Sequence, residues 1–168
     1  MTFFIDANIF VYSASASRYR FPCLEILRAI ASGTANGKTS PAVLEEVWFL
    51  ELSAKLGDLR GLTRRSYSAL TPLLPITDEI FLAALSLRAP NLGANDRVHA
   101  ATCLRNGIST IVSADSGLME SRGCAEWIRS TNEPGNPCSH PADALQLAQV
   151  FMMPSDAHEA ACQLCGSR

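Results

Sequence analysis

Phe3-Phe4-Ile5-Asp6-Ala7-Asn8, close to the start of the chain, is the stretch that decides the fold. Its apolar run lacks the alternation of a half-exposed strand, so it predicts a buried strand in the middle of a parallel sheet covered by helices. Ligands of such sheets bind beyond the carboxyl ends of the strands, where this strand delivers Asp6. A buried carboxylate must be paired, hydrogen-bonded or bound to a metal ion. Asp6 is therefore either a site residue or the cap of a following helix.

A second stretch, Thr110-Ile111-Val112-Ser113-Ala114-Asp115, repeats this pattern of a β-branched apolar strand that runs into a carboxylate. Neighbouring strands of a sheet lie about 4.8 Å apart. If these two strands are neighbours, Asp6 and Asp115 converge at the same edge of the sheet.

A helix that begins near Ser40 and Pro41 carries two adjacent acids, Glu45 and Glu46. Ser is a favourable N-cap and Pro fits the first helical position. Adjacent helical residues point about 100° apart, so both acids cannot face one site. Glu46 borders the apolar face that contains Val43, Val47 and Leu50, whereas Glu45 does not. We therefore expect Glu46 to point inward and Glu45 to be solvated.

The stretch from Asn95 to Gly107 predicts a helix packed closely on the sheet, with Gly107 as its C-terminal cap. Asp96 falls in its first turn, where the helix dipole favours a carboxylate, so capping is an alternative to a role in a site. His99 follows one turn later. A lone helical histidine is more often structural than a ligand or base, and we interpret His99 in that way.

Four carboxylates brought to one edge would repel one another and each would tend to hold a proton. Hard divalent cations relieve this repulsion. Mg²⁺ and Mn²⁺ prefer oxygen ligands, and they can activate water to attack a phosphodiester. Such a cluster is therefore typical of nuclease chemistry.

At these residues the chain resembles the PIN-domain family, in particular the VapC-like ribonuclease toxins. The resemblance covers roughly residues 2–130 and rests on four pieces in the family's order: residues 4–10, 40–47, 96–101 and 113–115. It implies an α/β fold with a doubly wound, mainly parallel sheet flanked by helices on both faces. It also implies a catalytic metal site for Mg²⁺ or Mn²⁺ made by Asp6, Glu46, Asp96 and Asp115, supported by hydrogen bonds from Asn8 and Ser113.

The resemblance further implies a metal-dependent endoribonuclease that acts as the toxin of a type II toxin-antitoxin pair, is homodimeric and is inhibited by its antitoxin. A housekeeping RNA-processing nuclease and a catalytically silent RNA- or protein-binding module remain alternatives. A phosphatase of the dehalogenase type would need a second Asp where Asn8 stands. The sequence departs from the family after Asp115, where Ser116-Gly117-Leu118 lacks the further acid that members often carry.

The net charge of −2 gives no global positive field for nucleic acid. RNA would have to be held by metal ions and by local cations. The candidates flank or lie on two predicted helices, Phe21 to Ser32 and Leu59 to Leu70, where each could equally be a solvated surface residue: Arg18, Arg20, Arg60, Arg64 and Arg65.

The 168 residues, of which 48% are hydrophobic and 18% charged, suit one compact nuclease domain over residues 1–130 followed by an extension over residues 131–168. We expect a cytoplasmic protein with reduced cysteines, because no signal peptide or membrane span is visible. In the extension, a partly ordered segment with free thiols and a structural zinc site are both open readings. The zinc ligands would come from Cys138, His140, His158, Cys162 and Cys165.

Overall fold

The computed structural model describes residues 2–87, 92–113 and 149–152. Within this part, four parallel strands form one sheet in the order β2-β1-β3-β4. The strands are β1 (Thr2–Ile5), β2 (Asn36–Lys38), β3 (Thr110–Ser113) and β4 (Gln149–Met152). Phe4 lies opposite Ile111 and Ile5 opposite Val112, so the two strands of similar sequence are neighbours, which the sequence left open.

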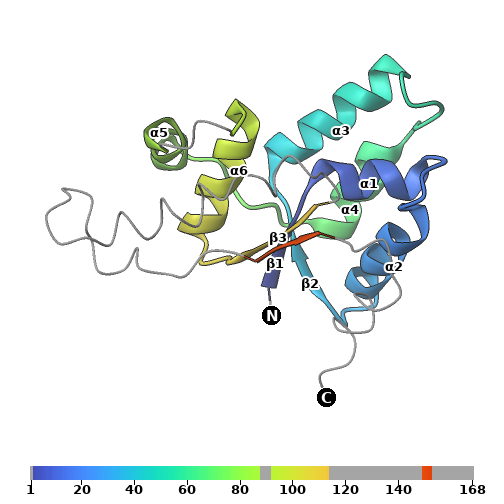
Figure 1. Cartoon of the computed structure of the whole chain (residues 1–168), viewed down its shortest axis with the longest axis horizontal. Coiled ribbons are helices and arrows are strands. Elements are labelled where there is room, and N and C mark those ends of the chain that lie inside the picture. The colour runs from blue at the N-terminus through green and yellow to red at the C-terminus, as the bar shows by residue number, and fades with distance from the viewer. Residues whose placement is uncertain (1, 88–91, 114–148, 153–168) are drawn as a thin grey trace, which may run out of the picture.

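The helices cover the sheet in two groups. Figure 1 shows α1 to α4 together on one side and α5 and α6 on the other, which confirms the predicted α/β fold. The helices are α1 (Ala7–Ala14), α2 (Arg20–Ala31), α3 (Pro41–Ser53), α4 (Leu62–Leu70), α5 (Asp78–Ser86) and α6 (Ala94–Arg105). None of the helices in the described ranges is long and apolar enough to cross a membrane.

The strand β1 lies at the centre of the main core. Phe3, Phe4 and Ile5 are buried and pack with apolar side chains of α1 to α4 and β3. A smaller core joins α5 to α6 through Ile80 and Ala101, among others. Burial of β1 on both faces matches its continuous apolar sequence.

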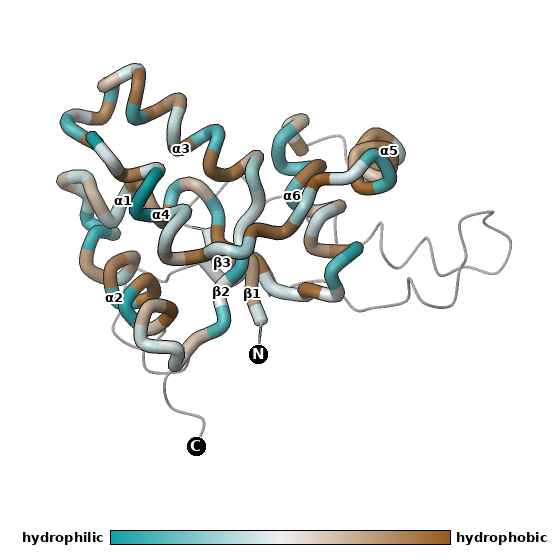
Figure 2. The backbone as a smooth tube through the Cα atoms, turned by 180° about the vertical axis from the view of Figure 1, so that it is seen from behind, coloured by the Kyte–Doolittle hydropathy of each residue, from teal (hydrophilic) through white to brown (hydrophobic). Residues whose placement is uncertain are grey.

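Some large apolar side chains remain at the surface. Figure 2 shows hydrophobic residues alternating with hydrophilic ones along α3, and hydrophobic residues on α5. The exposed ones are Trp48, Phe49 and Leu52 on α3, and Phe81, Leu82 and Leu85 on α5.

Several element boundaries differ from those that the sequence suggests. Helix α1 begins directly after Asp6, in agreement with the alternative in which this residue caps a following helix. Helix α4 begins at Leu62 and not at Leu59, because Gly61 adopts a left-handed φ of 74° immediately before it. The expected helix end at Gly107 is confirmed: this glycine has a φ of 63° just beyond α6.

Candidate active site

Asp6 lies at the carboxyl end of β1 and is also the N-cap of α1. Its side chain is 7% exposed and accepts three hydrogen bonds, from Ala7 N (2.7 Å), Asn8 Nδ2 (2.7 Å) and Ser113 Oγ (2.8 Å). The Asn8 amide also donates to Ser113 Oγ at 2.8 Å. Both readings of Asp6 therefore hold together: it caps a helix and it sits at the rim of the sheet. Asn8 and Ser113 thus both donate hydrogen bonds to Asp6, and their role in supporting a catalytic site stays a prediction.

The pKa of Asp6 is raised above its ordinary value because burial penalises the ionised carboxylate. The hydrogen bonds from Ser113 and Ala7 act in the opposite direction but do not cancel the effect of burial. The nearby Glu46 carboxylate raises the pKa of Asp6 further. The geometry thus holds an acid whose ionised form lacks sufficient compensation.

Glu46 approaches this position from the second turn of α3. Its Oε1 accepts hydrogen bonds from Asn95 Nδ2 (2.8 Å) and His99 Nε2 (3.2 Å), both on α6. Glu46 is half-buried, whereas Glu45 is exposed to solvent. The orientation of α3 is therefore the one that the helical spacing predicts.

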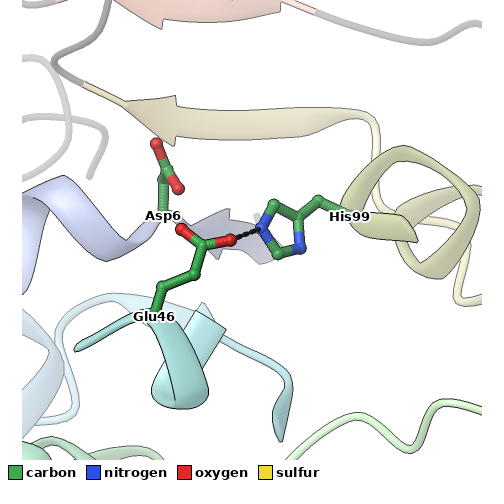
Figure 3. Close-up of side chains that lie close together, drawn as sticks. All are labelled: Asp6, Glu46 and His99. Carbon is green, nitrogen blue, oxygen red and sulfur yellow. Dashed lines mark hydrogen bonds and ion pairs between the residues drawn. The ribbon is translucent and has the colours of Figure 1, made fainter. Parts of the chain in front are cut away.

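His99 lies beside the two acids, a position that the sequence analysis did not predict. It is 3% exposed, its ring lies 5.6 Å from the Phe4 ring, and it faces Glu46 (Figure 3). Ligand atoms of Asp6, Glu46 and His99 all lie within 4.8 Å of one another. Asn95 was missed as well. The available signal was the spacing of Asn95 and His99, which at i and i+4 share one face of a helix.

Asp96 makes a different contact. It lies in the first turn of α6, is half-buried, and its Oδ2 accepts a hydrogen bond from Gly93 N at 3.1 Å. It is therefore placed as a helix cap and is not among the three groups that converge. Its role in the site stays a prediction. Asp115 lies outside the described residues, as do the cysteines and histidines considered for zinc.

Comparisons with known proteins identify the family of the chain. A family model described as PIN domain matches residues 3–122. The chain belongs to the PIN-domain family. It is 30% identical over 122 residues to Ribonuclease VapC23 of Mycobacterium tuberculosis, in each of two strains, across 68% of this chain and 94% of the relative. No solved structure matches it significantly.

The carboxylates of this PIN domain suit a hard divalent cation. Within the described ranges, no lysine or arginine forms an ion pair with Asp6 or Glu46. Two converging carboxylates, one of them buried and without a lysine or arginine partner there, offer the oxygen ligands that Mg²⁺ and Mn²⁺ prefer. The residues therefore fit the predicted metal, with Asp6 and Glu46 as the groups that would hold it.

The arginines proposed to hold RNA lie at the surface of the PIN domain but are not equally available. Arg60 is engaged by Asp58 through two hydrogen bonds, Nε to Oδ1 (2.8 Å) and Nη2 to Oδ2 (2.7 Å), which lower the pKa of Asp58 to about 2. Arg18 lies over the ring of Tyr19. The remaining three arginines are exposed and form no ion pair with another described residue: Arg20, Arg64 and Arg65.

Proposed function

We propose that this PIN domain is a metal-dependent endoribonuclease, the toxin of a type II toxin-antitoxin pair. The observation that carries the proposal is the convergence of the Asp6 and Glu46 carboxylates at the carboxyl edge of a parallel sheet, with the ionised form of Asp6 undercompensated. Membership of the PIN-domain family and similarity to a protein named as a ribonuclease support it.

The chain's own residues position the reacting groups. Ala7, Asn8 and Ser113 hold the Asp6 carboxylate from three directions, so its orientation is fixed before any ligand binds. A divalent cation held there would activate water for attack on a phosphodiester and stabilise the leaving oxygen. Asp96 and Asp115 are proposed as the further acids of the site.

Protein partners form part of the proposal. We infer a cognate antitoxin and a second copy of the chain as partners. Exposed apolar groups such as those on α3 and α5 are typical of interaction surfaces, which supports partners of this kind. A cytoplasmic location is supported by the thiols of Cys23 and Cys103, which are buried and free.

A metal titration coupled to a cleavage assay tests the activity. The wild-type protein is incubated with structured and single-stranded RNA at increasing Mg²⁺ or Mn²⁺. We expect cleavage inside the chain of the RNA that requires the cation, is lost in Asp6→Asn and persists in Asp78→Asn. Asp78 is a matched control because it is an exposed acid at the start of another helix.

Two results would overturn the proposal. Cleavage that is unchanged by removal of the cation, or by Asp6→Asn, would show that the carboxylates do not carry the activity. Absence of cleavage despite cation binding would favour the catalytically silent binding module. A housekeeping RNA-processing nuclease would cleave RNA without being inhibited by the protein encoded beside it.

A further inference from the structure

One oxygen of Glu46 receives two hydrogen bonds from the same helix. Asn95 Nδ2 lies 2.8 Å and His99 Nε2 lies 3.2 Å from Glu46 Oε1. Asn95 and His99 are four residues apart, so they occupy adjacent turns on one face of α6. Within the described residues, Glu46 Oε2 receives no hydrogen bond. The two oxygens of this carboxylate thus have different surroundings.

The surroundings of the other ring nitrogen of His99, Nδ1, indicate which nitrogen carries the proton. Nδ1 is buried and has no hydrogen-bond partner among the described residues. A proton on Nδ1 would be buried without an acceptor, which destabilises the fold, whereas a proton on Nε2 points at the Glu46 carboxylate. The structure therefore favours the tautomer in which Nε2 is the donor.

This tautomer bears on a simpler reading in which His99 is itself a metal ligand. The short distances among Asp6, Glu46 and His99 would permit that reading. However, ligation through Nε2 would move the ring proton to Nδ1, and a metal-bound histidine almost always donates its second N–H to an acceptor. In the described part of the chain, Nδ1 has no such acceptor.

We infer that His99 is a positioning residue that donates through Nε2 to Glu46 and is not a ligand of the cation. Together with Asn95 it occupies Oε1 of Glu46 and leaves Oε2 to face the cation beside Asp6. The inference rests on the proposed function, because it assigns a role within the same site. It explains why a histidine is buried beside the acids, because the histidine fixes the orientation of one metal ligand, Glu46.

Nitrogen NMR of the imidazole tests the tautomer directly. The chain contains three histidines, and the His99→Gln variant assigns the His99 signals by their disappearance. We expect Nε2 of His99 to carry the proton both without cation and with saturating Mg²⁺. Loss of the Nε2 proton when Mg²⁺ is added, with a proton appearing on Nδ1, would overturn the inference and identify His99 as a ligand.

The affinity for Mn²⁺, measured by titration calorimetry, tests the positioning role. His99→Leu removes the donor at similar volume, and we expect it to weaken binding by about 10-fold or more, as loss of supporting hydrogen bonds around metal ligands does. His99→Gln, which restores an N–H donor, should recover most of the affinity. Thr102→Val is the matched control, because Thr102 is buried on the same helix and its hydroxyl bonds to Val98 O and not to Glu46.

Asn95→Ala provides a variant at an exposed position, in case His99→Leu does not fold. It removes the second donor to Oε1, and we expect it to weaken Mn²⁺ binding by a few-fold. Wild-type affinity in both His99→Leu and Asn95→Ala would overturn the inference and leave the proposed function standing. A wild-type protein that binds no Mn²⁺ would overturn both.

Discussion

Asp6 and Glu51 are two carboxylates that accept the same number of hydrogen bonds and yet differ in their chemistry. Asp6 accepts from Ala7, Asn8 and Ser113. Glu51, on α3, accepts from Gly61 N (2.6 Å), Thr63 N (2.9 Å) and Thr63 Oγ1 (2.6 Å). The pKa of Asp6 is raised, mainly by burial, whereas the pKa of Glu51 is lowered, mainly by the side-chain and backbone hydrogen bonds from Thr63.

Hydrogen bonding alone therefore does not distinguish a structural acid from a functional one. Glu51 accepts hydrogen bonds from free N–H groups at the start of α4, and these bonds stabilise its ionised form without a cation. Asp6 is buried next to a second acid, so its charged form remains unfavourable until a cation is added. Variants that replace one acid or the other test this difference.

Asp6→Asn should have the largest effect. We expect RNA cleavage to fall by more than about 100-fold and the rise in thermal stability caused by Mg²⁺ or Mn²⁺ to disappear, because a ligand stabilises only a protein that binds it. Glu51→Gln is the control and should keep its metal response. Thermal unfolding with and without cation measures the difference, and equal metal responses in wild type and Asp6→Asn would contradict the assignment.

The same variant has a pH signature in metal-free protein. Because the folded pKa of Asp6 lies above the ordinary value of 3.8, the ionised form is penalised on folding. Its contribution to stability is thus lost as the pH rises from that value through the folded pKa. The stability of Asp6→Asn relative to wild type should increase as the pH rises from 3.8 through the folded pKa of Asp6. A difference that is flat or falls over this range in denaturant titrations would show that burial does not control Asp6.

Glu46→Gln should have the next largest effect. Glu46 faces Asp6 and His99, so we expect this change to lower the rate of metal-dependent cleavage by about 10-fold or more. Glu45→Gln on the exposed side of α3 is the matched control and should cleave almost normally. Cleavage rates at saturating Mn²⁺ measure both. Greater loss in Glu45→Gln would mean that the neighbouring acid carries the role.

Glu51→Gln should affect stability and not chemistry. It weakens the capping of α4, for which we expect a loss of about 1–2 kcal/mol in the free energy of unfolding at neutral pH. Since folding lowers the pKa of Glu51, its stabilising contribution is present above the unfolded value of 4.5 and is lost as the pH falls through the folded pKa. The variant and the wild type should therefore converge in acid, as urea unfolding at several pH values would measure. A gap that persists at acid pH would contradict a capping role for the charge.

The sequence predicted those features that depend on continuous local patterns. The apolar run of β1 identified a buried parallel strand, and the helical spacing of Val43 and Val47 identified Glu46 as the inward acid. Both succeed because a strand buried on two faces and an amphipathic helix have distinct periodicities. The similar sequences of β1 and β3 did not determine whether the two strands are neighbours, which the structure shows.

The features that the sequence did not predict depend on contacts between distant elements. Whether Asp96 caps α6 or enters the site depends on the direction of its side chain, which the sequence does not give. The hydrogen bond that Asp96 accepts from Gly93 N is compatible with either role. Glu51 accepts a hydrogen bond from Gly61, the N-cap of α4, which lies ten residues later and which no local capping motif describes. His99 looks structural until α3 and α6 are placed side by side.

The last and smallest effect concerns RNA binding by a chain of net charge −2. Its acids repel phosphates, so affinity must come from the cation together with local arginines, of which Arg64 and Arg65 are exposed on α4. Arginines of this kind contact phosphates without reading bases. We expect the double variant Arg64→Ala and Arg65→Ala to weaken RNA binding a few-fold for all sequences alike. The slope of the logarithm of the binding constant against the logarithm of the salt concentration should become shallower by roughly 0.7 per lost phosphate contact on single-stranded RNA. Binding is measured in a Glu46→Gln background, which slows cleavage of the RNA during the measurement. Arg60→Ala is the matched control, because Asp58 already engages that guanidinium, and it should change affinity less. If the double variant keeps the wild-type affinity and salt slope, this face of α4 does not contact RNA, and the phosphates are held elsewhere on the domain.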